Sequence, residues 1–373
     1  MTRVVVGEFL KGEKNTKVIG VGESETTGMR HGYIISFNDA VSSIKKAVIQ
    51  AEKSSGIKIK RAFVSIGGIS MRGEVSIGSA IISKADSEVT NLDINKALED
   101  CENNLNLGNK KIIGSFPVYY KLDGKEVLGR PEGMRGNKLE MKTLFVTCSK
   151  QHCEDLLNVL AEAGIETIDF IASPIASSSI ALSKKQKIVG VALVNIGAET
   201  TSLAVFENET LVFLHIFSIG SEDITNDIAL GLKISLKEAE SLKLDSSSLD
   251  FPKKKVEEII EARLSDIFEL IENHLKKIKR NELLPAGIIF VGGGSNILNI
   301  EELSKSFLKL PSKVGATEIF GNTKTKLREN TWFTALGLLM SIKNSQSYGE
   351  GSFSTFFKDL KSTLKSSVKQ LLP

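Results

Sequence analysis

The chain reads Val194-Asn-Ile-Gly-Ala-Glu-Thr-Thr-Ser-Leu-Ala-Val205 where an apolar strand runs into Gly197 and a second strand begins. In a tight turn of this kind, backbone N–H groups and the hydroxyls of Thr200 and Thr201 can converge on phosphate oxygens. The stretch therefore predicts a phosphate-binding hairpin. An ordinary hairpin turn without a ligand is the alternative.

Two further motifs predict contacts to a nucleoside. In Ile288-Ile-Phe-Val-Gly-Gly-Gly-Ser295, three glycines after a buried strand let the backbone lie close to a flat ligand; a simple loop leading to a helix is the alternative. In Leu236-Lys-Glu-Ala-Glu-Ser-Leu-Lys243, Glu240 and Lys243 share one helical face and can flank a ribose or base; a pair of solvated charges is the alternative. The loop matches neither the Walker A nor the Rossmann spacing.

A strand–hairpin–helix order occurs twice along the chain. The first half has strands at Thr2–Phe9, Thr16–Gly22 and Arg61–Gly67 and a helix at Asn38–Ser54. The second half has strands at Ile188–Val194, Thr200–Glu207, Thr210–Ser218 and Gly287–Val291 and helices at Ser221–Leu232, Ser235–Leu242 and Lys253–Lys279. This repetition predicts two similar lobes with a cleft between them. Residues 73–149 predict a compact β–α–β–β insert, in which Thr90 caps the helix.

Composition excludes several classes of protein. The 373 residues suggest two or three domains, and 48 basic against 45 acidic residues argue against nucleic-acid binding through overall charge. The three cysteines form no CxxC pair, which is typical of reduced thiols in a cytosolic protein. The four histidines have no metal-ligand spacing, so no metal site is predicted. No apolar stretch approaches the ~18 residues that a membrane span needs.

The excess positive charge lies in residues 353–373, which predict an amphipathic membrane-binding helix. The apolar side chains recur at helical spacing on one stripe: Phe353, Phe356, Phe357, Leu360, Leu364, Val368, Leu371 and Leu372. The lysines beside or opposite the stripe are Lys358, Lys361, Lys365 and Lys369. Such a helix lies along an anionic bilayer surface, because its lysines forbid spanning. A helix packed on the protein's own core is the alternative.

The order of these motifs resembles the actin/Hsp70 ATPase superfamily. Within it, the chain is most similar to the FtsA family of actin-like bacterial cell-division proteins. The resemblance includes Ser218-Ile-Gly-Ser-Glu-Asp-Ile-Thr-Asn-Asp-Ile-Ala229 and segments outside the nucleotide motifs, at residues 27–34, 131–139, 172–182 and 284–287. It implies an α/β, actin-like two-lobed ATPase fold with an FtsA-type (SHS2-like) inserted subdomain and a C-terminal amphipathic helix.

The resemblance also implies a division of the chain and a set of ligand contacts. The first lobe comprises 1–72 and 150–185, the insert 73–149, the second lobe with the nucleotide site 186–340, a flexible linker 341–352 and the membrane helix 353–373. The implied cofactor is ATP or ADP with Mg²⁺. The residues implied to contact it are Asn195, Gly197, Ala198, Thr200, Thr201 and Gly220 near the phosphates and Glu240, Lys243, Gly292, Gly293, Gly294 and Ser295 near adenosine.

Two departures from the family pattern predict slow or absent hydrolysis, and no catalytic residue is assigned. The family's first phosphate loop, of the Asp-x-Gly-Thr type, should precede the strand at Val4, whereas this chain begins Met1-Thr2-Arg3; an upstream start codon would restore it. The second phosphate loop usually carries Asp where this chain has Asn195. A neutral amide is a weaker ligand for Mg²⁺ than a carboxylate.

The function implied by the resemblance is that of a membrane-associated cell-division protein. It tethers the ring of the tubulin-like FtsZ to the membrane and forms filaments through head-to-tail contacts. The implied partners are the FtsZ C-terminal tail, other divisome proteins, further copies of the chain and an anionic membrane surface. The implied location is peripheral, on the cytoplasmic face of the cell membrane at the septum. The alternatives are a PilM-like pilus-assembly protein and, in another class, an actin-fold kinase.

Overall fold

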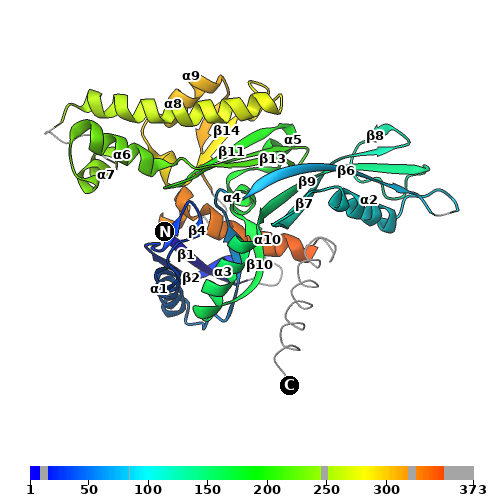
Figure 1. Cartoon of the computed structure of the whole chain (residues 1–373), viewed down its shortest axis with the longest axis horizontal. Coiled ribbons are helices and arrows are strands. Elements are labelled where there is room, and N and C mark those ends of the chain that lie inside the picture. Colours follow the sequence, from blue (N-terminus) through cyan, green and yellow to red (C-terminus); the bar gives the residue numbers. More distant parts are fainter. Residues whose placement is uncertain (9–15, 84, 245–250, 318–324, 348–373) are drawn as a thin grey trace.

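The computed structural model describes residues 1–8, 16–83, 85–244, 251–317 and 325–347 and shows two lobes and a projecting arm (Figure 1). The second lobe lies at the top of Figure 1, the first lobe below it, and the arm extends to the right. The chain enters the arm from the first lobe through β6 and returns to it through α3.

The second lobe is built on strands that are nearly continuous in apolar sequence. β11 pairs antiparallel with β12 and parallel with β14, which pairs with β15; β12 continues into β13. The elements are α5 (Lys184–Val189), β11 (Val191–Ile196), β12 (Thr201–Glu207), β13 (Thr210–Phe217), α6 (Ser221–Leu232), α7 (Leu236–Leu244), α8 (Lys253–Lys277), β14 (Ile288–Val291), α9 (Ile300–Leu308) and β15 (Ser312–Val314).

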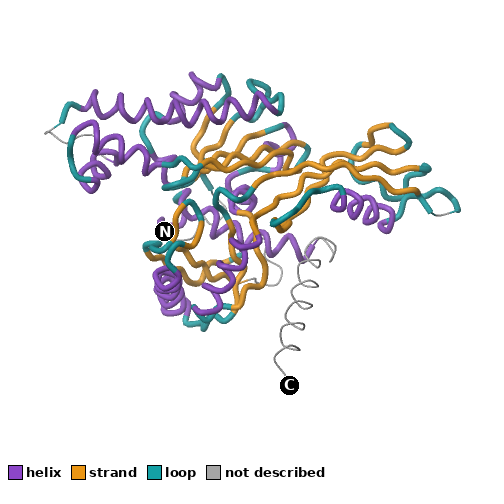
Figure 2. The backbone as a smooth tube through the Cα atoms, in the orientation of Figure 1, coloured by secondary structure: helices purple, strands orange, loops and turns teal. Residues whose placement is uncertain are grey.

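Alternation along β11 explains why both faces of this sheet are covered. Ala192, Val194 and Ile196 pack with the apolar face of α6 and α8, while Val191 and Leu193 belong to the core shared with the first lobe. Side chains two residues apart point to the same face of a strand, and adjacent ones point to opposite faces. A continuous apolar run therefore indicates a strand that is buried on both faces. In Figure 2, α8 runs along the outer face of this sheet.

The first lobe differs from the second in its sheet. Its hairpin β1–β2 and its parallel pair β5–β10 are separate two-stranded sheets, with no described strand that joins them as β11 joins β12 to β14. The elements are β1 (Thr2–Glu8), β2 (Lys17–Ser24), β3 (Met29–Arg30), β4 (Tyr33–Ile34), α1 (Phe37–Ser55), β5 (Arg61–Ile66), α3 (Lys150–Glu162), β10 (Glu166–Ala172), α4 (Ser173–Ala181) and α10 (Phe333–Ser347).

The arm is an antiparallel sheet with one helix packed on it. Thr90 caps this helix as predicted, because its side chain accepts from the Asp93 amide while Asp93 bonds back to the Thr90 backbone. At the base of the arm, the register of β6 with β13 pairs Arg72 with His215, which makes one nine-stranded sheet of the arm and the second lobe. The elements are β6 (Arg72–Ile81), α2 (Asn91–Asn103), β7 (Lys110–Leu122), β8 (Lys125–Val127) and β9 (Lys138–Ser149).

Three segments differ from or lie beyond the sequence predictions. Ile188 and Val189, predicted to begin a strand, end helix α5 instead. Helix α10 continues to Ser347 and so occupies residues 341–347, the first part of the predicted linker. The rest of the linker and the predicted membrane helix lie outside the described residues. Within the described ranges, no helix has the length and apolar character needed to cross a membrane.

Candidate functional site

The two glycine-containing loops lie side by side at the carboxyl ends of β11 and β14. These strands are parallel neighbours, with Asn195 opposite Val291, so the turn at residues 197–200 and the loop at 292–295 leave the same edge of the sheet. Ligands of open α/β sheets bind at this edge of parallel strands. The topology therefore brings together the first two sequence motifs, which are about 90 residues apart.

Close backbone contacts explain most of the glycines in this region. A Cβ on Gly292, whose φ is 88°, would collide with the side chain of Asn195, and one on Gly294 would collide with Ile196. A Cβ on Gly220 would collide with the carbonyl oxygen of Ala198. Gly293 is different, because a Cβ there would meet no atom within 4 Å. Gly293 is thus the loop position with space in front of it.

The turn at 197–200 is held by the first turn of α6. The amides of Ser221 and Glu222 donate to the carbonyls of Gly197 and Ala198, at 2.9 and 2.8 Å, and the Gly220 amide donates to Asp223. These three amides at the start of α6 therefore already donate hydrogen bonds within the protein. Within the turn, the amides of residues 198–200 make no hydrogen bond to the described part of the chain. They are the donors left for an anion beside the Thr200 hydroxyl.

Glu240 and Lys243 reach this region from α7. The Lys243 ammonium donates to Glu240 Oε2, Thr225 Oγ1 and the Ser221 carbonyl at 2.6, 2.8 and 3.1 Å, and its side chain is only 6% exposed. Burial opposes ionisation of Glu240, but hydrogen bonds from Lys243 and Thr225 outweigh it and hold its pKa below the usual range. The pair is therefore not a set of solvated charges. It joins α7 to α6, the helix whose first turn supports the turn at residues 197–200, here called the phosphate-type turn.

Two hydroxyls predicted to contact nucleotide make hydrogen bonds within the protein. Thr201 is fully buried and donates to the Ile219 carbonyl at 2.8 Å. Ser295 is 1% exposed, donates to the Gly292 carbonyl and accepts from Asn330 Nδ2 at 2.6 Å. Both side chains fix the shape of their loops.

Orphaned polar atoms lie beside the glycine loop. Within the described part of the chain, Asn330 Oδ1 and Trp332 Nε1 are buried without a hydrogen-bond partner, although the other end of the Asn330 amide holds Ser295 and Asn296. Arg3 lies over the Trp332 ring at 5.3 Å, and its Nε makes an ion pair with Glu23 Oε2 at 3.7 Å but no hydrogen bond to the described residues. Buried polar groups are nearly always paired, so this cluster marks a place where a further polar group fits.

The first lobe contacts the phosphate-type turn directly. The His31 amide donates to Glu199 Oε2 at 2.7 Å, and His31 Nδ1 lies 3.1 Å from the Glu199 carbonyl oxygen. Glu199 is the one carboxylate in the turn, and this bond engages it. Among the described residues there is no group of three or more His, Cys, Asp or Glu side chains placed to hold a metal ion.

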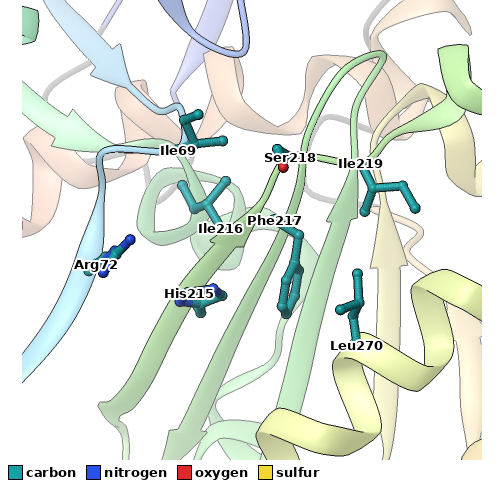
Figure 3. A pocket seen from close by; sticks show the side chains of 8 residues that line it. All are labelled: Ile69, Arg72, His215, Ile216, Phe217, Ser218, Ile219 and Leu270. Carbon is teal, nitrogen blue, oxygen red and sulfur yellow. The ribbon is translucent and has the colours of Figure 1, made fainter.

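A separate pocket of about 340 Å³ lies beside the loop at Ser218 and Ile219, which connects β13 to α6 (Figure 3). Ile69, Arg72, His215 to Ile219 and Leu270 line it, and none of them is a residue predicted to bind nucleotide. His215 lines the pocket from β13, and its ring stacks on the ring of His274 from α8, with the ring centroids 4.4 Å apart. Burial, followed by the nearby His274, lowers the pKa of His215 to about 4. This ring is therefore neutral at physiological pH, and the pocket has a mixed lining in which Arg72 and Ser218 lie among apolar side chains.

The residues present fit a nucleotide better than a metal cluster. The space at Gly293 and the spare turn amides lie at one edge of the sheet, and Asn330 reaches this edge through its hydrogen bond to Ser295. The sequence motifs did not identify His31, Thr225, Asn330 or Trp332. Thr225 lies one turn after Ser221 and was accessible to a helical-spacing argument. His31 comes from the first lobe, and Asn330 and Trp332 come from the short 3-10 helix before α10; none of the three carries a local signal.

Two family models match the chain. The model described as "Cell division protein FtsA" matches residues 192–337, and the model described as "SHS2 domain inserted in FTSA" matches residues 66–147. The cell division protein FtsA of Bacillus subtilis (strain 168) is 29% identical over 371 residues, which cover 93% of this chain and 82% of that protein. The FtsA of Pseudomonas aeruginosa is 27% identical over 367 residues, with coverage of 92% and 87%.

Solved structures show the same fold. The PilM-PilN type IV pilus biogenesis complex aligns with a TM-score of 0.69 at 14% identity, over 91% of this chain and 94% of that chain. The ethanolamine utilization protein EutJ from Carboxydothermus hydrogenoformans aligns with a TM-score of 0.50 at 16% identity, over 84% and 77%. At such identities the likeness concerns the fold alone. The predicted actin-like α/β fold with an SHS2-type insert is confirmed.

Proposed function

Since this chain belongs to the FtsA family of cell-division proteins, we propose that it is a nucleotide-binding adaptor that tethers FtsZ filaments to the membrane. The observation that carries the nucleotide part is the contrast between Gly293, which faces open space, and Gly292, Gly294 and Gly220, which are packed against neighbouring backbone or side-chain atoms. A loop that is held this firmly and yet open at one position suits a flat ligand.

The proposed ligand is ATP or ADP, with Mg²⁺ bound through its phosphates. The amides of residues 198–200 and the Thr200 hydroxyl would face the phosphates, and the loop at Gly293 would face the nucleoside. Lys243 and Glu240 would border it from α7. When bound, Mg²⁺ supplies charge neutralisation at the phosphates. Hydrolysis is proposed to be slow, because Asn195 is neutral and the Glu199 carboxylate already accepts from His31.

Nucleotide binding is tested with Gly293→Val. The new side chain enters open space, so we expect the thermal melting temperature of the free protein to stay within ~2 °C of wild type. We expect the affinity for a fluorescent ATP analogue to fall at least roughly tenfold, which is about 1.4 kcal/mol. Ala161→Val, on the exposed surface of α3, is the control for adding a branched side chain. Equal affinities for wild type and both variants would remove the nucleotide from the proposal.

The membrane part of the proposal rests on the sequence of residues 353–373. Leu364 lies within the apolar stripe and Ser366 lies about 200° away on a helix, so Leu364→Glu and Ser366→Glu add the same charge to opposite faces. We expect Leu364→Glu to abolish co-sedimentation with vesicles that contain anionic phospholipid, and Ser366→Glu to retain most of it. Equal loss in both variants would favour charge alone over an embedded face.

The adaptor function requires FtsZ and further copies of the chain as partners. The family assignment supports the FtsZ C-terminal tail, other divisome proteins and head-to-tail filaments as the interactions to test, at the cytoplasmic face of the septal membrane. In a vesicle assay, FtsZ should pellet only with vesicles that carry the full chain, and not with a chain lacking 353–373. Recovery of FtsZ without the tail would contradict the tether.

The PilM-like alternative draws on a likeness of fold, which does not specify function. An actin-fold kinase would require rapid transfer of phosphate to a small acceptor. Magnesium-dependent phosphate transfer at the rate of a metabolic kinase would favour the kinase function over the adaptor function.

A further inference from the structure

A cluster of nucleophilic side chains lies where the arm joins the first lobe, away from the nucleotide loops. Cys148 is near the end of β9, and His152 and Cys153 lie in the first turns of α3. Ser70 comes from the loop between β5 and β6. These four residues belong to three segments that meet at one joint. Nothing in the nucleotide or membrane proposals uses them.

The cluster is closely connected. Ser70 Oγ lies 2.9 Å from His152 Nδ1 and 3.2 Å from Cys148 Sγ, and Cys148 Sγ lies 3.5 Å from His152 Nδ1. Cys153 belongs to the same buried core cluster as Cys148, and it is the largest influence on the pKa of the Cys148 thiol. One imidazole is thus placed to accept the Cys148 proton, and a second thiol lies in the same cluster.

The two thiols differ in acidity. The hydrogen bond from Cys153 is the largest effect on Cys148; burial opposes it, but His152 and Ser70 add to it, and together they lower the Cys148 pKa to about 5. The Cys153 pKa is raised, first by the same hydrogen bond and then by burial. His152 and Ser70 both lie within hydrogen-bond distance of Cys148 Sγ, so Cys148 is the thiol placed to lose its proton and act as the nucleophile of the pair.

We propose that Cys148 and Cys153 are a modification site at which a hydroperoxide forms a reversible intramolecular disulfide. The Cys148 thiolate attacks one peroxide oxygen, the O–O bond breaks, and the departing hydroxide takes the proton held by His152 to leave as water. Cys148 is then a sulfenic acid. Cys153 attacks its sulfur, the S–O bond breaks, and the second hydroxide leaves as water with the Cys153 proton. Two thiols and one hydrogen peroxide give one disulfide and two waters.

The third cysteine provides an internal comparison. Cys101 is also fully buried, but its Sγ donates to the Met141 carbonyl at 3.3 Å, and burial raises its pKa. Cys148 and Cys153 are equally buried, whereas Ser70, which contacts Cys148, is only half-buried. Burial alone therefore does not distinguish the three thiols. The groups that contact each sulfur atom do distinguish them. We expect oxidation at the pair and not at Cys101.

The disulfide would tie β9 to α3 at the joint of the arm. The His152 ring packs against the Tyr33 ring in a tilted arrangement with the centroids 5.1 Å apart, and the Ile69 amide, next to Ser70, donates to the His31 carbonyl. His31 in turn holds Glu199 in the phosphate-type turn. The oxidised joint is therefore two contacts away from the candidate nucleotide site.

The test uses the full chain, treated with hydrogen peroxide, blocked with N-ethylmaleimide in denaturant, and digested with trypsin. Lys150 separates the two cysteines, so a disulfide links peptide 143–150 to peptide 151–184 and a reductant separates them. We expect this linked pair to form at least roughly tenfold faster than any loss of Cys101 thiol, because thiolate is the reactive form. Cys153→Ser should instead trap Cys148 as a sulfenic acid that dimedone labels.

Two results would overturn the proposal. One is full maleimide labelling of Cys148 and Cys153 in wild type after peroxide has begun to consume Cys101. The other is a wild-type disulfide that joins two chains or includes Cys101. Both readings come from wild-type protein, so they do not depend on whether a variant folds, and neither depends on nucleotide or membrane binding.

Discussion

The His31 amide donates to the Glu199 carboxylate across the two lobes, at 2.7 Å. His31 has a positive φ of 47° in the turn between β3 and β4, and Glu199 is in the hairpin turn between β11 and β12. A second contact joins His31 Nδ1 to the Glu199 backbone. The bond connects the lobes directly beside the candidate nucleotide loops and commits the only acid of the turn to a structural contact.

Removal of this carboxylate should loosen the contact between the lobes. Hydrogen bonds to charged groups contribute about 1.5–3 kcal/mol, but partial exposure here reduces the expected loss for Glu199→Ala to about 1 kcal/mol. Urea denaturation at pH 7 measures it. Glu154→Ala, at an exposed position of α3, is the control. If both variants unfold at the same urea concentration, the bridge makes no net contribution in solution.

The glycines of the two loops should respond differently to the same substitution. Gly220→Ala places a methyl group against the Ala198 carbonyl and must move the start of α6, which overpacking data suggest costs about 1–3 kcal/mol. The φ of Gly220 is −153°, so the cost is steric and not conformational. Gly293→Ala meets no atom and should cost less than about 0.5 kcal/mol. The melting temperatures of the two variants, compared with wild type, measure this contrast. Equal shifts in melting temperature would refute it.

Local patterns in the sequence predicted most of the second lobe. Helix α6 begins and ends at the predicted residues, Ser221 and Leu232, because a glycine and two acids mark its start and the apolar spacing sets its length. The strand predicted to begin at Ile188 begins at Val191 instead, because two apolar residues at the end of a short helix cannot be distinguished by pattern from the start of a buried strand.

Contacts between distant segments could not be predicted from local patterns. The single register pair of Arg72 with His215 merges the arm with the second lobe, and neither residue carries a pairing signal in its own segment. The same holds for Asn330, which reaches the glycine loop from the far end of the chain. Tertiary packing fixes these positions, whereas glycine content and helical spacing had already identified the loops themselves.

Asp169 should make stability depend on pH in the acidic range. It is 5% exposed in β10, and burial is the main reason that its pKa rises to about 6 from an ordinary value of 3.8. Between these values the folded state binds more protons than the unfolded state, so this group's contribution to stability falls as pH rises from about 4 to 6. Asp169→Asn removes that dependence.

We therefore expect the stability of Asp169→Asn relative to wild type to increase between pH 4 and 7 by an amount on the order of 2–3 kcal/mol. Denaturant titrations at several pH values measure the difference. Glu166→Gln, on the exposed end of the same strand, should show no such trend. A relative stability that stays constant over this range would mean that Asp169 ionises normally in the fold.

Lys243 should stabilise the junction of α6 and α7 through its charge. Lys243→Met keeps the apolar stem but removes the ammonium that Glu240, Thr225 and the Ser221 carbonyl accept from. Breaking a fully buried ion pair costs about 3–5 kcal/mol, but Glu240 is 44% exposed and water can reach it, so we expect about 1–2 kcal/mol.

Lys237→Met, on the exposed face of the same helix, is the control and should change stability by less than about 0.5 kcal/mol. Adding Glu240→Gln to Lys243→Met should recover part of the loss, because the carboxylate then no longer lacks its cation. The coupling energy from this double-mutant cycle separates the ion pair from simple packing. Because the apolar stem is retained in Lys243→Met, additive effects of the two substitutions would show that the ammonium acts through Thr225 and the Ser221 carbonyl and not through the Glu240 carboxylate.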